Sequence, residues 1–291
     1  MTDAHDSEDN GIRHVHLDIN LNAPQHELQR SIQKCIYLVS GGLVSASQIE
    51  EPKLKLPDTT IEMTFDPSLV WSTLDVRNHL QEWILLNGFR DAVESLGSFL
   101  EHNHAICSAW RLIQLQAQGR TLTGADWERA MVGEAQKFHR LGLPDKLNHL
   151  NEEHGIELDN ALSRHMLSIN AARNCLVHRD GVVGERDSVD GRLVVSWRRV
   201  KWVITDEDGE RDLVSGVVYE KESSLGMKFL DEKRSFKLGD RITFSAPEFQ
   251  HIAWSMYLFG VTTGLKITEW GVANGFITLP RTDAAERGTN E

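Results

Sequence analysis

The chain has 291 residues, of which 40% are hydrophobic and 25% are charged, as in a soluble globular protein with one large or two small domains. Its formal net charge of −12 argues against a protein that coats long nucleic acids through a global positive field. No apolar run reaches the roughly 18 to 20 residues of a membrane helix. The acidic start MTDAHDSEDNG lacks the pattern of a signal peptide, so we expect a cytoplasmic protein without a membrane partner.

The cysteines and the glycine patterns give no sign of a cofactor. Cys35, Cys107 and Cys175 are isolated, odd in number and set in apolar sequence, which favours buried reduced thiols over a disulfide or a zinc site. The chain has no phosphate-binding glycine loop and no Gly-x-Ser-x-Gly elbow. We therefore expect no cofactor.

The N-terminal part is predicted to hold one helix between two irregular segments. Residues 1–22 are acidic and are expected to be mobile, although the alternating IRHVHLDINL could add an edge strand. Residues 23–66 are predicted to form a helix that starts near Pro24 and ends at Gly41–Gly42, followed by a linker with one short strand.

A long helical block follows. Residues 72–119 could form one helix or two in succession, with Ser72 or Thr73 as the cap and Gly119 as the stop. Further helical patterns occupy residues 123–142, starting near Thr123 or Asp126, residues 143–155, and residues 157–181, which end at Gly181.

The hydrophobic period then changes to that of strands. Three strands are predicted, in GRLVVSWRRVKWVI, LVSGVVYE and MKFLDEKRSFKL, with turns at TDEDGE and LGDR. A final helix, capped by Ser245, must return to the bundle to bury its apolar face. The expected fold is thus mainly α: a helical bundle over residues 67–275, with a small antiparallel sheet inserted at about 190–240 and a disordered tail over 276–291.

The segment NAARNCLVHRDGVVG, residues 170–184, places polar residues at the end of an apolar helix. On a helical wheel Asn174 and His178 share one face. Arg173 lies at the edge of the core stripe, from which its head can turn toward His178. Metal-free RNA cleavage needs a group that moves protons near neutral pH, which suits histidine, and a cation for the charge that builds on the phosphate, which suits arginine. The alternative is a capped helix end whose cations favour the helix dipole, and a bare Arg-four-residues-His pattern is expected about once by chance in this chain.

The longer string ARNCLVHRDGVV resembles the signature of the HEPN superfamily of ribonucleases, in which Arg, a polar residue, a few apolar residues and His are followed by a polar-Gly-aliphatic turn. The resemblance is specific only over this string; residues 73–271, less the β insertion, agree with the family in architecture. It implies a HEPN-like bundle that acts as a homodimer and a metal-independent endoribonuclease of toxin–antitoxin, antiviral or RNA-processing systems. Arg173 and His178 would be catalytic and Asn174 supporting.

The resemblance also implies partners. These would be RNA, with transfer RNA among the candidates, a second copy of the chain, and an antitoxin or regulatory protein. Because the family includes inactive members, a non-catalytic binding or dimerisation protein remains the alternative.

Four further cations are predicted to contact RNA. SWRRVKW interleaves tryptophans with Arg198, Arg199 and Lys201, a pattern that suits base stacking and phosphate pairing. Arg179 in the motif turn is the fourth. The alternative for SWRRVKW is an amphipathic strand packed on the bundle. The alternation places Trp197, Arg199 and Lys201 on one face of such a strand.

Three other patterns have ordinary interpretations. In NHLNEEH, His149 and His154 are five residues apart, which favours a solvated helix face over a metal site. HNH at residues 102–104 lacks the ββα-metal context of the nucleases with that name. Arg90 and Glu94 are spaced as a helical ion pair, although one of them could orient the motif from a facing helix.

Overall fold

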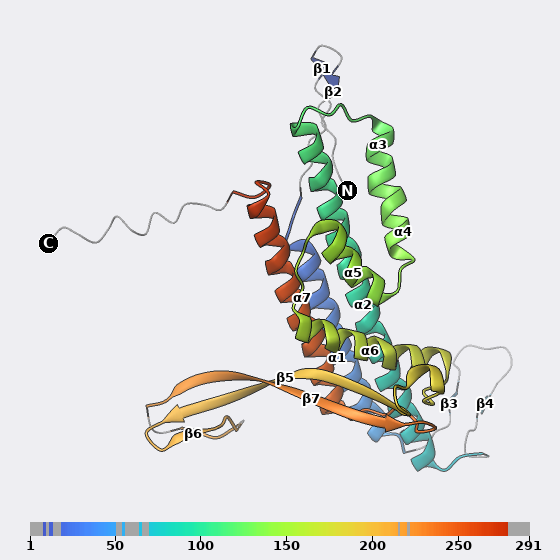
Figure 1. The fold of residues 1–291 in the computed structure, drawn as a ribbon. Helices are drawn as coiled ribbons and strands as arrows, with labels where there is room; N and C mark the ends of the chain where they lie inside the picture. The colour runs from blue at the N-terminus through green and yellow to red at the C-terminus, as the bar shows by residue number, and fades with distance from the viewer. Residues whose placement is uncertain are drawn as a thin grey trace.

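Three long helices form the body of the protein in the computed structural model (Figure 1). The structure describes residues 19–50, 70–214, 216–219 and 222–278, together with four two-residue strands. These strands pair in sequence as β1 (Glu8–Asp9) with β2 (Ile12–Arg13), and β3 (Leu54–Lys55) with β4 (Thr64–Phe65). The N-terminal segment, 1–22, was predicted to be mobile and the C-terminal tail, 276–291, to be disordered. Most residues of both segments lie outside the described ones.

The helices are arranged as a bundle with one crossing member. The long helices α1 (Ala23–Ser47), α2 (Thr73–Ala117) and α7 (Ala246–Ala273) lie side by side, and α6 (Asn160–His178) runs across them (Figure 1). The connection from α2 to α6 consists of α3 (Gly124–Glu128), the π-helical turn η2 (Arg129–Glu134), α4 (Ala135–His139) and α5 (Leu143–His154). None of the helices that the structure describes combines the length and the apolar character needed to span a bilayer.

Capping chemistry explains where most helices begin. Three helices start with a full capping box, in which the cap hydroxyl and the side chain three residues later satisfy each other's backbone N–H groups: Ser72 with Asp75, Thr123 with Asp126, and Ser245 with Glu248. The segment from 72 to 119 is one helix of 45 residues. Its cap at Ser72 and its end before Gly119, which has a φ of 86°, confirm the predicted limits.

The predicted end of the first helix is wrong. The helix α1 continues through Gly41 and Gly42 to Ser47. A Cβ atom at Gly42 would lie 3.1 Å from Cδ1 of Ile84 in α2. The glycine therefore serves close packing between two helices, and this tertiary contact outweighs its low helix propensity.

The core is formed by the apolar rows that the helical spacing predicts. The buried row of α1 faces buried residues of α2 and α7, among them Leu28, Ile32, Val39, Phe89, Leu96, Leu100, Phe249, Ile252, Met256 and Phe259. The three cysteines are buried free thiols, as expected. Burial raises the pKa of the Cys107 thiol to about 12, so this group stays protonated at neutral pH.

The inserted sheet is antiparallel and precedes the last helix, as predicted. Its order is β6 (Gly209–Asp212), β5 (Arg192–Asp206) and β7 (Ser224–Lys237). The two long strands pair from Arg192 opposite Lys237 to Thr205 opposite Ser224 and form a ribbon that extends past the bundle (Figure 1). The sheet is anchored because α6 and α7 both pack against β5.

The expected strand over residues 213–220 is wrong. The turn after β5 contains only Glu207 and Asp208, because Asp206 already pairs with Gly209. The sequence predicted a turn of six residues, TDEDGE. The returning strand β6 instead starts within that stretch, at Gly209, and ends at Asp212. The described residues of 213–220 form no strand.

Close helix contacts at glycine give a first prediction. A Cβ atom at Gly88 of α2 would lie 2.2 Å from Cγ2 of buried Val39, a side chain that is stiff in a helix. Overpacking costs about 1–3 kcal/mol and alanine recovers up to about 1 kcal/mol of helix propensity, so Gly88→Ala is expected to lower the free energy of urea unfolding by about 1–2 kcal/mol. Gly97→Ala is the matched control on the same helix, since its nearest neighbour would be Nζ of Lys146 at 4.0 Å. It should be neutral or stabilising, and equal effects of both changes would contradict the prediction.

Candidate functional site

The motif lies at the end of a helix that is fixed at both ends. Asp159 caps α6 by accepting hydrogen bonds from the backbone N–H groups of Ala161 and Leu162. At the other end Gly181 has a φ of 72°, and its N–H donates to the carbonyl of Cys175. The N–H of Ile242 donates to the carbonyl of Gly181 at 2.8 Å, which fastens the motif turn to the segment before α7. The backbone that carries the motif is therefore hydrogen-bonded at both ends of the helix.

Arg173 is held by two partners in the free protein. Its NH1 group donates to Oδ1 of Asn174 at 3.3 Å, and its NH2 group donates to Oε1 of Glu94 on α2 at 3.4 Å. The side chain of Arg173 is only 25% exposed. Glu94 also lies 3.8 Å from Arg90, with which it forms the helical ion pair that its spacing predicted. The sequence left a contact with the motif from a facing helix as the alternative, and Glu94 makes that contact as well.

His178 stands apart from these groups. It is the last residue of α6, its side chain is exposed, and no described residue forms a hydrogen bond or ion pair with it. The sequence suggested that the head of Arg173 could turn toward His178, but the guanidinium group is hydrogen-bonded to Asn174 and Glu94 instead. The structure thus brings Arg173 and Asn174 together and leaves the imidazole open to solvent one turn further along.

Arg179, predicted to contact RNA, joins the motif turn to the short 3-10 helix η3 (Glu185–Asp187). Its Nε donates to Oδ2 of Asp187 at 2.5 Å, and its NH2 group bonds the other carboxylate oxygen. The side chain of Asp187 is almost fully buried, and this hydrogen bond raises the pKa of Arg179. Such a buried bidentate pair supports the turn structurally.

A second arginine ties the motif turn to α2. Arg241 donates to Asp180 at 2.9 Å and to Glu82 at 3.2 Å. Arg173, Arg179 and Arg241 are thus each matched by a nearby carboxylate. At these three arginines the described surface has no excess of the positive charge that non-specific RNA binding uses.

The cations of SWRRVKW each lie beside an acidic residue. Arg198 bonds Asp231 at 2.8 Å, Arg199 bonds Glu232 at 3.0 Å, and Lys201 bonds Asp212 at 2.7 Å. Trp197 is buried and donates to Glu232, whereas Trp202 is exposed. The segment therefore has the features of an amphipathic strand packed on the bundle, which was the alternative to an RNA-contacting strand. Contact of its cations with RNA stays a prediction.

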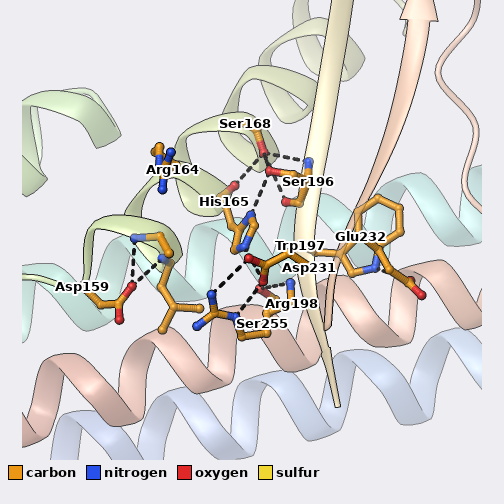
Figure 2. A network of polar contacts seen from close by, with 12 residues as sticks. Asp159, Arg164, His165, Ser168, Ser196, Trp197, Arg198, Asp231, Glu232 and Ser255 are labelled. Atoms are coloured by element: carbon orange, nitrogen blue, oxygen red, sulfur yellow. Dashed lines mark hydrogen bonds and ion pairs between the residues drawn. The ribbon is translucent and has the colours of Figure 1, made fainter. Parts of the chain in front are cut away.

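A buried histidine, not predicted as functional, joins α6 to the sheet. Nδ1 of His165 lies 2.8 Å from the hydroxyl of Ser196, and its Nε2 lies 3.2 Å from Asp231, which Arg198 also bonds (Figure 2). The backbone N–H of Arg198 donates to the hydroxyl of Ser255 on α7. The network thus connects two helices and two strands.

This order of Asp, His and Ser resembles a nucleophile triad in its connections, but its setting is structural. The Ser196 hydroxyl lies 3.3 Å from that of Ser168, and the backbone N–H of Ser196 donates to the same Ser168 oxygen at 2.9 Å (Figure 2). The partly buried hydroxyl is thus bonded within the helix–sheet contact, and both ring nitrogens of His165 are occupied. A triad needs a nucleophile that faces substrate.

The network gives a prediction for pH dependence. The hydrogen bond from Arg198, followed by that from His165, lowers the pKa of Asp231 below its ordinary value of 3.8. Because the folded pKa is depressed, this stabilisation is complete above the unfolded value and is lost as the pH falls through the folded pKa. Asp231→Asn should therefore reduce the fall in the free energy of unfolding between pH 5 and pH 3, modestly, since the carboxylate is half exposed and screened. Identical falls in both proteins would contradict this.

Comparisons with known proteins leave the identity of the chain open. No family model, no curated protein and no solved structure matches it. The function is therefore inferred from the residues of the site.

A groove of about 500 Å³ between α1 and α2 reaches the carboxylate that holds Arg173. Its lining includes Glu27, Asp91 and Glu94, which outnumber the single cation, Lys34. An acidic groove repels a phosphate backbone.

Proposed function

We propose that the protein is a metal-independent endoribonuclease of the HEPN type, with Arg173 and His178 as catalytic residues and Asn174 as a supporting residue. One observation carries the proposal: an exposed imidazole without a partner among the described residues stands at the rigid end of α6, one turn from a half-buried arginine. Because the side chain of His178 is exposed, a substrate can reach it from solution.

The proposed chemistry uses the RNA, the side chains of the protein and water. The 2′-oxygen attacks the adjacent phosphorus, the bond to the 5′-oxygen breaks, and the products are a 2′,3′-cyclic phosphate and a 5′-hydroxyl. His178 takes the 2′ proton or supplies the proton to the leaving oxygen. In a homodimer the imidazole of the second copy would supply the other transfer, and otherwise water does so.

Arg173 would stabilise the charge that builds on the phosphate oxygens. To do so it must exchange Glu94 for the phosphate. The contact at 3.4 Å is long for a charge-assisted hydrogen bond, and Glu94 is half exposed, so this exchange is inexpensive. Asn174 would keep the guanidinium group near the end of the helix during the exchange.

The test is cleavage of single-stranded RNA and transfer RNA by the purified protein in EDTA. We expect products with cyclic phosphate and 5′-hydroxyl ends, and no cleavage of DNA of the same sequence, because DNA lacks the 2′-hydroxyl. Cleavage of both nucleic acids, or products with 5′-phosphate ends, would rule out this chemistry.

A non-catalytic protein that binds or dimerises through the motif face is the second candidate. It is favoured by two apolar side chains near His178: Val177 is 43% exposed and Val182 is 40% exposed. The paired charges of Arg179 and Arg241 also fit a protein contact better than an RNA groove. Under this alternative Val177→Asp should lower the mass measured in solution, and the RNA should stay intact.

A further inference from the structure

Three histidines from distant parts of the sequence converge away from the motif. His104 lies on α2, and His149 and His154 lie on α5. One nitrogen from each imidazole lies within 4.8 Å of the others. In the ranges that the structure describes, this is the one group of three such residues placed to share a metal ion.

The cluster is built into the interior. Nδ1 of His104 and Nε2 of His154 are 3.0 Å apart, and both side chains are buried. The ring of Phe138 stacks on His104 at 4.2 Å and meets the ring of His149 edge-on. The expected solvated helix face is therefore wrong for His154: the residue at the end of α5 turns inward toward α2.

Two atoms of this cluster have unmet bonding capacity. Nε2 of His104 and Nδ1 of His154 are buried and have no hydrogen-bond partner. Buried polar atoms without partners are rare because burial removes their hydrogen bonds to water. These two atoms are the outer nitrogens of the rings and would remain N–H donors in a metal site. The inner nitrogens, Nδ1 of His104 and Nε2 of His154, share a single proton in their mutual contact, whereas a metal ion between them would use both of their lone pairs.

We propose that His104, His149 and His154 form a binding site for one divalent transition-metal ion, with zinc as the best fit. Three imidazoles favour zinc, copper or nickel over magnesium and calcium, which prefer oxygen ligands. In a tetrahedral site with Zn–N distances near 2.0–2.1 Å the ligand nitrogens are about 3.3 Å apart, so the pair already at 3.0 Å needs little change.

His149 is the half-buried member of the three, and Glu134, at the end of η2, is the carboxylate whose charge acts on His104. π-Helical turns occur often at functional sites. The ion would join α5 to α2, and α5 leads to the motif helix through a loop of only five residues, 155–159.

The experiment uses the full chain without an affinity tag, stripped with EDTA and dialysed. Calorimetric titration with Zn²⁺ should show one site per chain, and Co²⁺ should give the absorption of a four-coordinate nitrogen site. His149→Ala is the first variant, because its side chain is only half buried. It should weaken Zn²⁺ binding at least about 100-fold, more than the loss of a residue that only supports a ligand. His102→Ala, an exposed histidine on α2, is the matched control and should bind as the wild type does.

The outcomes decide the proposal independently of RNA cleavage. The wild-type Co²⁺ spectrum needs no variant, and His104→Ala gives a second test wherever circular dichroism shows that it folds. The proposal is overturned if the stripped wild type binds no Zn²⁺ at micromolar concentration, or if His149→Ala and His104→Ala bind as tightly as the control. Since the ribonuclease assay contains EDTA, its failure would not affect the metal titration, and the reverse also holds.

Discussion

The substitution His178→Ala is expected to lower the rate of RNA cleavage by about 10²- to 10⁴-fold, the range that general acid–base catalysis contributes. The free energy of unfolding should change by no more than about 0.5 kcal/mol. The imidazole is exposed and has no partner among the described residues, so its removal leaves no buried group unsatisfied. Single-turnover kinetics in EDTA and urea unfolding measure the two effects separately.

The matched control for His178 is His26→Ala. His26 is also an exposed histidine on a long helix, but it lies on α1, away from the motif. It should cleave RNA at the wild-type rate. If both variants retain full activity, His178 is not the proton-transfer group, and any cleavage observed comes from another site or a contaminant.

Arg173→Ala is expected to have the second largest effect, a loss of about 10²- to 10³-fold, as for removal of a group that stabilises transition-state charge. Arg173→Lys should recover little, because an ammonium group lacks the planar fork that bonds two phosphate oxygens. Cleavage rates measured at saturating RNA distinguish this loss from weaker binding.

The control for Arg173 is the other arginine that contacts Glu94. Arg90 lies 3.8 Å from the same carboxylate, and its side chain is half exposed. Arg90→Ala should change the cleavage rate by less than about threefold, as expected for an exposed ion pair worth under 1 kcal/mol. Equal losses in both variants would mean that the charge balance around Glu94, and not a catalytic arginine, controls activity.

If the wild-type protein does not cleave RNA, the residues around the motif would instead belong to a binding or dimerisation surface. The exposed Val177 and Val182 would then mark a contact surface, and the link from Arg241 to Asp180 and Glu82 would serve to keep that surface rigid. A change of mass in Val177→Asp would support that interpretation.

The local features of this fold were predictable because each depends on a few neighbouring residues. The capping pairs at Ser72 and Ser245 and the stops at Gly119 and Gly181 fix helix ends through hydrogen bonds and backbone angles that lie within one turn. The alternation in SWRRVKW likewise predicted that Trp197 and Arg199 share a face, and both bond Glu232.

The sequence by itself determined the elements, their apolar faces and the position of the motif at a helix end, because these follow from periodicity and short-range bonds. Only the tertiary structure decided which distant side chains meet. It placed Glu94 beside Arg173 and paired each cation that was predicted to contact RNA with a carboxylate. It also brought His104 close to His149 and His154, whose five-residue spacing had argued against a shared site. Charge pairing and burial depend on how helices pack, and packing is a property of the whole core that no short stretch of sequence specifies.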